Sequence, residues 1–506
     1  MPRTSLKLPL FERAAGIRER TAIVAPEGAF NFGELLDASG WVATRLLAGR
    51  DDLDSERICY LVPPGWHHVA VQWGIWRSGG LAVPLATSHP AAEFAYVLDD
   101  ASPEAVVAHP DLIDRVSGVA AERQLPVLQT PALLAEGPTG VLPDLAADRS
   151  AMMLYTSGTT GRPKGVVVTH GNLQAQVSSL SDAWGWSEHD HILLHLPLHH
   201  VHGITNILTS ALWNGATCEI LSRFNAVDVW ERLSRGDCTL YMAVPTVYRR
   251  LLEAWQRADP ATREAWSAGA LACRLMVSGS AALPVPTLER WQEITGQRLL
   301  ERYGMTEIGM ALSNPLNGER RAGHVGQPLP GIDVRLVDEA GRPVAAGAEG
   351  EIQVRGPTVF STYWRREQET QDAFAEEDWF NTGDQAVVED GAYRILGRAS
   401  VDILKTGGEK ISALEIEDVL RSYTGVVDCA VVGVPDADWG DRVCAAVVCE
   451  ASHPLDVDAL RGFARERLAP YKVPKQIILV DALPRNAMGK VTKPTVVELF
   501  DLRDVD

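Results

Sequence analysis

The stretch Tyr155-Thr-Ser-Gly-Thr-Thr-Gly-Arg-Pro-Lys164-Gly165 places glycines, hydroxyls and one cation in a single loop. Apolar runs at 151–155 and 165–169 flank this loop, so we predict a strand-loop-strand hairpin. A Walker loop would open a helix and carry a magnesium-binding hydroxyl directly after its lysine, whereas Gly165 follows Lys164 here. The stretch therefore predicts a polyphosphate cradle for ATP that is not of the Walker kind. The alternative is a polar surface turn.

Composition bounds the class of protein. The 506 residues include 46% hydrophobic side chains and exceed what one core usually supports, so we expect two or more domains. The 66 acidic against 47 basic side chains give a net charge of -19, which argues against nucleic acid and anionic membranes as partners. The seven cysteines form no C-x-x-C pair, and the sequence shows no signal peptide or membrane-spanning run. We therefore expect a cytoplasmic protein without a disulfide framework or a zinc site.

The chain divides into two parts of different pattern. Alternating helical and strand-like apolar segments run from about residue 32 to residue 396, which indicates a large α/β domain over residues 1–397. A polar, glycine-containing stretch then leads into a small α+β domain over residues 398–506. In this second part we predict helices at 412–423 and 457–468 and strands at 426–434, 443–449 and 476–480. Ser412 and Glu415 predict a capping box at the start of the first helix, and Gly425 predicts its end.

Six further segments occur in order along the chain. They are Pro197-Leu-His-His-Val-His-Gly203, Ser278-Gly-Ser-Ala281, Glu301-Arg-Tyr-Gly-Met-Thr-Glu307, Thr382-Gly-Asp384, Gly397-Arg398 and Pro484-Arg-Asn-Ala-Met-Gly-Lys490. Together with the loop at 155–165, this set resembles the adenylate-forming superfamily of acyl-coenzyme A synthetases, luciferases and nonribosomal peptide adenylation domains. The resemblance spans nearly the whole chain. It implies a large multi-subdomain N-terminal α/β domain and a small mobile C-terminal α+β domain.

The resemblance also implies roles in an ATP site. The residues implied for the pyrophosphate side are Thr156, Ser157, Gly158, Thr159, Thr160, Gly161 and Lys164. The residues implied for the rest of ATP are Ser280, Ala281 and Tyr303 at the adenine, Thr306 at the α-phosphate, Asp384 at the ribose, and Arg398 at the ribose or a phosphate. Glu307 resembles the magnesium ligand, since a carboxylate close to ATP needs a cation between them.

Lys490 resembles the lysine that bridges the attacking carboxylate and the α-phosphate, and Thr306 and His200 are the other catalytic candidates. A well-placed donor of this kind stabilises a transition state by ~3 kcal/mol. The small domain would rotate about a hinge at 398–402 between the two half-reactions, and the pivot residue stays open. Gly407 and Gly408 would let the pantetheine arm of coenzyme A approach the backbone, with a plain glycine turn as the alternative.

The acid substrate is indicated by Arg274, which precedes the apolar strand that leads to Ser278. The phrase Cys273-Arg-Leu-Met-Val-Ser-Gly-Ser-Ala-Ala-Leu283 resembles the malonyl-coenzyme A synthetases. One malonate carboxylate would attack ATP and the other would need a cation, for which a guanidinium offers a bidentate fork. The predicted carboxylate pocket consists of Arg274, His200, His202 and Ser278. A surface ion pair is the alternative for Arg274.

The sequence thus predicts a ligase that joins malonate or methylmalonate to coenzyme A with ATP and Mg²⁺. Its partners would be these small molecules, without nucleic acid or membrane, and the oligomeric state is not indicated. The alternatives are a ligase for another small or medium acid, an adenylation enzyme that loads a carrier protein, luciferase-like oxidation, and an inactive nucleotide binder.

Overall fold

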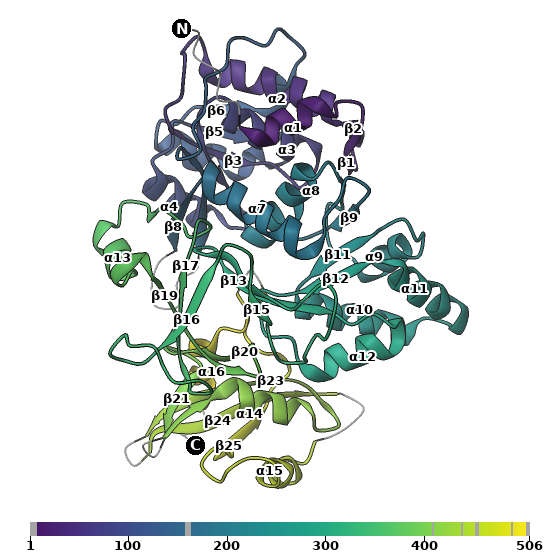
Figure 1. Ribbon diagram of the computed structural model, residues 1–506, viewed down its shortest axis with the longest axis vertical. Coiled ribbons are helices and arrows are strands. Elements are labelled where there is room, and N and C mark those ends of the chain that lie inside the picture. The colour runs from purple at the N-terminus through teal and green to yellow at the C-terminus, as the bar shows by residue number, and fades with distance from the viewer. Residues whose placement is uncertain are drawn as a thin grey trace.

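The computed structural model describes residues 8–156, 163–406, 409–436, 439–450, 455–486 and 489–501. Four β-sheets organise these residues, three of them within 21–398 and the fourth within 403–479. In Figure 1 the N-terminal elements lie at one end of the long axis and the C-terminal sheet lies at the other. This arrangement confirms the predicted fold class, a large N-terminal α/β part followed by a small C-terminal α+β part.

A seven-stranded sheet carries the hairpin of the quoted stretch. Its strands, in spatial order, are β18 (Thr362–Tyr363), β8 (Lys164–Thr169), β7 (Ser150–Thr156), β4 (Leu81–Pro84), β3 (Arg57–Leu61), β5 (Ala105–Ala108) and β6 (Val127–Gln129). Strands β7 and β8 are antiparallel, and Thr156 pairs with Lys164 where they end and begin. The predicted strand-loop-strand hairpin is therefore confirmed.

A nine-stranded sheet forms the second layer. Its strands, in spatial order, are β15 (Gln327–Pro328), β14 (Gly309–Ser313), β13 (Leu300–Met305), β12 (Leu275–Ser278), β11 (Leu240–Ala243), β9 (His191–Leu194), β10 (Thr217–Ile220), β1 (Thr21–Ala25) and β2 (Gly28–Asn31). From β13 to β1 the strands are parallel. Their carboxyl ends therefore meet at one edge of the sheet, where open α/β sheets bind ligands.

Helices cover these two sheets. In chain order they are α1 (Pro9–Gly16), α2 (Phe32–Leu47), α3 (Trp66–Arg77), α4 (Ala91–Ala101), the 3₁₀ helix η1 (Pro110–Arg115), α5 (Ser117–Glu122), α6 (Thr130–Leu134), α7 (His170–Trp184), the π-helix η2 (His202–Thr209), α8 (Ser210–Trp213), α9 (Ala226–Leu233), α10 (Pro245–Arg257), α11 (Pro260–Ala272), α12 (Val285–Thr295), α13 (Glu367–Asp372) and the 3₁₀ helix η3 (Glu376–Asp378).

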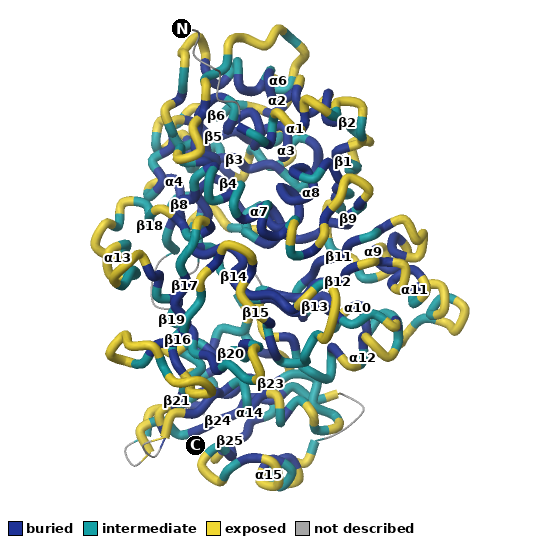
Figure 2. The backbone as a smooth tube through the Cα atoms, in the orientation of Figure 1, coloured by how far each residue is buried: buried dark blue, intermediate teal, exposed yellow. Residues whose placement is uncertain are grey.

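The large part has one main apolar cluster and two smaller ones. One apolar cluster reaches from Phe32 and Trp73 to Val277 and Leu300, so both large sheets share it. Figure 2 shows central strands such as β11 and β12 buried, whereas the edge strand β15 and most of α13 are exposed. No helix of the described residues is long and apolar enough to cross a membrane.

An antiparallel four-stranded sheet connects the large part to the small part. Its strands, in spatial order, are β16 (Asp333–Val337), β17 (Gly350–Arg355), β19 (Phe380–Glu389) and β20 (Ala392–Arg398). Asp384 on β19 pairs in register with Arg398, the last residue of β20. Two residues implied for the ribose are therefore neighbours at the end of this sheet.

The small part is a five-stranded sheet covered on both faces. Its strands are β22 (Glu409–Ser412), β21 (Ile403–Thr406), β24 (Gly440–Cys449), β23 (Val426–Asp436) and β25 (Gln476–Leu479), and its helices are α14 (Ala413–Arg421), α15 (Val457–Arg465) and α16 (Lys493–Asp501). One apolar cluster includes Ile416 of α14 and Leu460 of α15, and a second includes Phe500 of α16.

Two local predictions at α14 need correction. The Ser412 hydroxyl accepts from the N–H of Glu415 at 3.2 Å, but the Glu415 carboxylate binds Lys472 instead of completing the capping box. The helix ends at Arg421, before Gly425, which takes a φ of 93° in the following turn. The Ser412 cap is therefore present, and an ion pair with a distant lysine replaces only the Glu415 half of the capping box.

Candidate functional site

The turn after β12 brings small residues to the carboxyl edge of the nine-stranded sheet. Ser280 has a φ of 70°, a conformation that costs free energy for a residue with a side chain and is found often at functional sites. Its hydroxyl lies 3.1 Å from Nδ1 of His202, the first residue of η2. The hydroxyl of Ser278 and Nε2 of His202 are buried without a partner among the described residues. This turn therefore offers polar atoms that a ligand could satisfy.

A buried arginine lies beside the turn. Arg302 on β13 is 4% exposed, and its Nε and Nη2 atoms lack partners among the described residues. Burial lowers its pKa to about 9, and burial and the charge of Arg302 lower the pKa of His202. The guanidinium lies against Gly279, where an added Cβ would approach its Cζ to 2.4 Å. An unpaired buried cation is costly, so this place suits a bound anion.

Arg274 does not lie at this place, so the sequence-based pocket needs correction. Its Nε and Nη2 atoms bind the two carboxylate oxygens of Asp190 at 2.7 Å each, and its Nη1 donates to the carbonyl of Trp184. Arg274 precedes β12, at the amino end of the strand, whereas Ser278 ends it. Among the other predicted pocket residues, His202 lies close enough to Arg302 for its charge to lower the histidine pKa, and the ion pair considered as an alternative is what Arg274 forms.

The residues implied for adenine and ribose lie together. Tyr303 donates from its hydroxyl to Oδ2 of Asp384 at 2.6 Å, and Nε of Arg398 donates to Oδ1 of the same carboxylate at 2.9 Å. Burial, and next the charge of Asp384, raise the pKa of Tyr303, so it stays a neutral donor. The trio joins β13, β19 and β20 into one polar wall.

Glu307 follows the turn that contains Thr306, between β13 and β14, and is 6% exposed. Its Oε1 accepts from the hydroxyl of Tyr363 at 3.1 Å, and burial raises its pKa. The ammonium group of Lys164 lies 5.1 Å from the centre of the Tyr363 ring and pairs with Glu369. Tyr363 thus connects the carboxylate to the end of the glycine-rich loop.

Lys490 brings the small part to the same site. Lys490 is itself exposed, and its pKa is lowered by partial desolvation beside the large part and by the nearby charges of Arg398 and Arg302, against the opposing effect of Asp384 and Glu307. Burial and the Lys490 charge lower the pKa of His200 to about 4, and Nε2 of this imidazole has no partner among the described residues. The predicted catalytic lysine and pocket histidine are therefore close to the arginine that the sequence reading missed.

Some predicted residues lie outside the described residues. They are Ser157, Gly158, Thr159, Thr160 and Gly161 of the loop and the pair Gly407 and Gly408. The described ends of these segments are Thr156, at the end of β7, and Thr406, at the end of β21. Ala281 is described and exposed, directly after Ser280.

Sequence reasoning missed Arg302 and Tyr363. Arg302 stands inside the quoted Glu301–Glu307 segment, shortly after Leu299 and Leu300, and its position at the end of this apolar pair was a usable signal. Tyr363 belongs to the two-residue strand β18, which no periodicity could reveal. Tyr363 could be identified only from the three-dimensional structure.

Comparisons with known proteins follow the same division. A family model described as AMP-binding enzyme matches residues 10–364, and one described as AMP-binding enzyme C-terminal domain matches residues 415–490. The chain is 45% identical to the mitochondrial malonate–CoA ligase of Mus musculus, over 98% of this chain and 91% of that protein.

Solved structures give the same likeness. The ATP-bound MatB of Rhodopseudomonas palustris is 34% identical, with a TM-score of 0.90 over 97% of this chain and 99% of that one. A malonyl-CoA ligase in a ternary product complex with methylmalonyl-CoA and AMP is 36% identical, with a TM-score of 0.70 over 95% and 100% of the two chains.

Proposed function

The chain belongs to the AMP-binding enzyme family, and on that premise we propose that it is an AMP-forming ligase that joins malonate to coenzyme A. In the first half-reaction a malonate oxygen attacks the α-phosphorus of ATP, which gives malonyl-adenylate and pyrophosphate. In the second, the coenzyme A thiol attacks the acyl carbon, which gives the thioester and AMP. The main support for malonate as the substrate is the guanidinium of Arg302 beside His202, whose Nε and Nη2 atoms have no partner among the described residues.

Arg302 holds the distal carboxylate of malonate in this proposal. Its Nε and Nη2 atoms are buried without partners in the described part of the chain, and two such donors match the two oxygens of a carboxylate. His202 and Ser278 supply further polar atoms at the same edge. A monocarboxylic acid would leave the cation buried and unpaired, which costs about 1–3 kcal/mol or more. The site therefore favours a dicarboxylic acid, with methylmalonate as the branched variant.

ATP occupies the wall formed by Tyr303, Asp384 and Arg398. The tyrosine ring stacks on adenine, and the carboxylate of Asp384 accepts from the ribose hydroxyls. Thr306 contacts the α-phosphate, and Thr156, Lys164 and the loop between them hold the departing pyrophosphate. Ser280 and Ala281 border the adenine. The support for these roles is the 2.6 Å and 2.9 Å contacts that join the trio next to the Glu307 turn.

Glu307 fits a divalent cation. It is a buried carboxylate whose pKa burial raises, with Tyr363 as its neutral donor, so a nearby cation would compensate its negative charge. We assign it as the ligand for Mg²⁺. When bound, this ion neutralises charge on the phosphates. Lys164 contacts the polyphosphate, and Tyr363 orients the Glu307 carboxylate through its hydrogen bond.

Lys490 acts in the first half-reaction. Its ammonium group shares the site with His200 and Arg302, where it stabilises the charge that forms between the carboxylate and the α-phosphate. Thr306 and His200 assist at the same atoms. The second half-reaction needs this space for the pantetheine arm. We infer a domain boundary at 397/398 and a rotation of residues 398–506 about 398–402. The higher TM-score for the ATP complex than for the product complex, at similar identity, supports this rotation.

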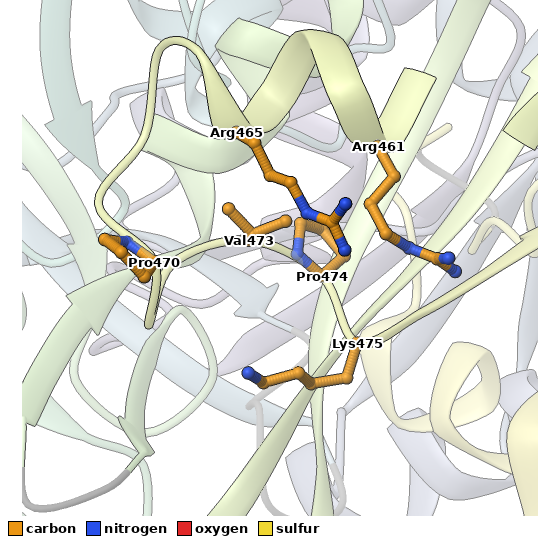
Figure 3. A pocket seen from close by; sticks show the side chains of 6 residues that line it. All are labelled: Arg461, Arg465, Pro470, Val473, Pro474 and Lys475. Carbon is orange, nitrogen blue, oxygen red and sulfur yellow. The ribbon is translucent and has the colours of Figure 1, made fainter. Parts of the chain in front are cut away.

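Coenzyme A approaches the small domain along Gly407 and Gly408 in this proposal. A cationic pocket of about 470 Å³ on the same domain, lined by Arg461, Arg465, Pro470, Val473, Pro474 and Lys475, is shown in Figure 3. Lys475 also lies 4.5 Å from the ring centre of Trp439. In a chain with a net charge of -19, local cations next to an aromatic ring suit the phosphates and adenine of coenzyme A.

The remaining parts of the proposal concern location and partners. We propose a cytoplasmic enzyme whose partners are malonate, ATP and coenzyme A, without nucleic acid or membrane. Fluorescence microscopy of the tagged full chain, with a mitochondrial marker beside it, tests the location. Colocalisation with the marker would contradict it.

The test of function is pyrophosphate release with ATP and magnesium across malonate, methylmalonate, succinate, acetate and octanoate. We expect malonate to be the best acid, with thioester and AMP appearing only when coenzyme A is added. Lys490→Ala should lower malonate-dependent release by roughly 100-fold, because ~3 kcal/mol of transition-state stabilisation is lost. A faster monocarboxylate would refute the malonate assignment. Acyl transfer to a carrier protein but not to coenzyme A would favour the carrier-loading alternative.

A further inference from the structure

We propose that Lys493 is a positioning residue for Lys490. It closes a ring of ion pairs that fixes the loop bearing Lys490, and it ties this loop to the turn between the four-stranded sheet and the small domain. The inference rests on the proposed function, since it requires Lys490 to act in adenylation. Lys493 itself touches no part of the ATP site in this role.

The loop that carries Lys490 is narrow at its base. Thr492 donates from its N–H to the carbonyl of Pro484 at 2.9 Å, and Arg485 and Val491 form an antiparallel bridge. The backbone N–H of Lys490 donates to the side-chain oxygen of Asn486 at 3.0 Å. The two ends of the loop therefore set where Lys490 lies, and whatever anchors these ends also anchors the lysine.

Lys493 anchors one end. It is the first residue of α16 and is 9% exposed. Its ammonium group lies 2.6 Å from Oδ1 of Asp402 and 2.9 Å from Oε1 of Glu417. Burial lowers the pKa of Lys493, but the charges of Glu417 and Asp402 outweigh it and raise the pKa overall. The side chain thus stays charged between two carboxylates from different elements.

Arg485 anchors the other end. Its guanidinium donates to the carbonyl of Gly489, the residue before Lys490, and to the carboxylate of Asp428. Asp428 lies 3.6 Å from Nε of Arg421, and Nη2 of Arg421 donates to Glu417 at 3.0 Å. Glu417 is the carboxylate that Lys493 holds. The two anchors are therefore joined into a closed ring through α14 and β23.

The ring alternates in charge. Glu417 is 3% exposed and also accepts from the backbone N–H of Val431 at 2.9 Å. Burial opposes the charged form of Glu417, but Lys493 and Arg421 keep its pKa below the usual value. Removing Lys493 would leave two carboxylates without their shared cation. The ring would lose its connection to the loop at that point, because Lys493 is its member closest in sequence to Lys490.

Asp402 connects the ring to the end of β20. Its Oδ2 accepts from the backbone N–H of Arg398 at 3.0 Å, and its carbonyl accepts from Ala413 of α14 at 2.8 Å. Arg398 is the residue whose side chain binds Asp384 in the ATP wall. One carboxylate thus contacts both Lys493 and the end of β20. Through these contacts the loop that carries Lys490 is held at a defined place relative to Asp384 and Arg398, the residues that would hold the ribose.

The test compares Lys493→Met, Lys493→Arg and a matched control in the full-length chain. Lys472→Met is the control, because Lys472 binds Glu415 of the same helix at 2.7 Å but has no described contact with the 484–492 loop. We expect Lys493→Met to lower the kcat of malonate-dependent pyrophosphate exchange by about 10- to 100-fold, with the KM values for ATP and malonate nearly unchanged. Lys493→Arg should recover most of the rate.

Two further measurements separate positioning from folding. Thioester formation from preformed malonyl-adenylate should change by less than about twofold, since Lys490 acts in the other half-reaction. The double variant Lys490→Ala/Lys493→Met should be no slower in exchange than Lys490→Ala alone, because Lys493 acts only through Lys490.

Several outcomes would overturn the proposal. These are unchanged exchange in Lys493→Met, an equal loss in both half-reactions together with a lower Tm, a rate like that of Lys472→Met, or additive losses in the double variant. Absence of malonate-dependent exchange in the wild type would refute the proposed function instead. The acid that does support exchange would then serve as substrate for the same comparison.

Discussion

The arginines at the two edges of the nine-stranded sheet differ in whether the protein provides partners for their guanidinium groups. At the amino edge, Arg274 uses its guanidinium on Asp190 and on the carbonyl of Trp184. At the carboxyl edge, Arg302 is buried with two guanidinium nitrogens unpartnered among the described residues. Two arginines less than thirty positions apart therefore differ in whether the fold satisfies them. We propose that the unsatisfied one marks the ligand site.

Other polar side chains at the amino edge also have partners within the protein. His191, Glu219 and Cys238 place ligand atoms within 4.8 Å of one another, which is close enough for a metal ion. Arg232, however, donates from Nε to both oxygens of Glu219 at 2.6 and 2.7 Å and also pairs with Asp237. A guanidinium already takes the place next to the carboxylate that a cation would use. The cluster therefore stabilises the sheet edge.

The largest expected effect is at the carboxyl edge. Arg302→Met keeps most of the side-chain volume but removes the cation that would bind the distal carboxylate. We expect kcat/KM for malonate to fall by about 100-fold, near 3 kcal/mol, with a much smaller loss for acetate. The ratio of the two acids, measured by pyrophosphate release, is the readout.

Arg320→Met is the matched control for this variant, because Arg320 binds the carbonyls of Pro315, Leu316 and Arg298 away from the site. It should leave the ratio of malonate to acetate unchanged. If Arg302→Met also preserved that ratio, the unpartnered guanidinium would not be the specificity element, and the contrast between the two edges would lose its functional meaning.

These residues show how much of the fold and of the candidate site could be predicted from the sequence. The hairpin, the order of the motifs and the small domain were predictable, because they depend on local periodicity and on turn chemistry. The prediction of Arg274 did not use the direction of β12: Arg274 immediately precedes this strand, at its amino end, whereas Arg302 lies on the neighbouring strand β13. Tyr363 could not be found without the fold, since its contact with Glu307 spans 56 positions.

The second prediction concerns Arg274→Met at the amino edge. Asp190 would lose its guanidinium partner while its side chain remains 2% exposed. Arg274 is itself 31% exposed, so the loss in unfolding free energy should be moderate, about 2 kcal/mol, below the range for fully buried pairs. Urea unfolding measures it. The preference for malonate over acetate should not change, and a changed preference would return Arg274 to the substrate pocket.

The third prediction displaces Arg302 without removing it. In Gly279→Ala the new Cβ would lie 2.4 Å from both Cζ and Nε of Arg302, so the guanidinium must shift. Overpacking of this kind costs about 1–2 kcal/mol, and we expect the KM for malonate to rise roughly tenfold. Gly118→Ala, where nothing lies within 4 Å, is the control. An unchanged KM for malonate would mean that the guanidinium of Arg302 can shift without weakening malonate binding.

The smallest expected effect is a pH dependence that should be absent. Burial alone would raise the pKa of Asp190, but hydrogen bonds from Arg274 and Thr239 hold it below the usual 3.8. For a carboxyl with a depressed folded pKa, the stabilisation is present above the unfolded pKa and is lost as the pH falls through the folded pKa. The difference in unfolding free energy between wild type and Asp190→Asn, which has no carboxyl to titrate at this position, should therefore stay constant from about pH 8 to about pH 5. A difference that shrinks within this range would show that Asp190 takes up a proton there, which a carboxylate satisfied by its arginine should not do.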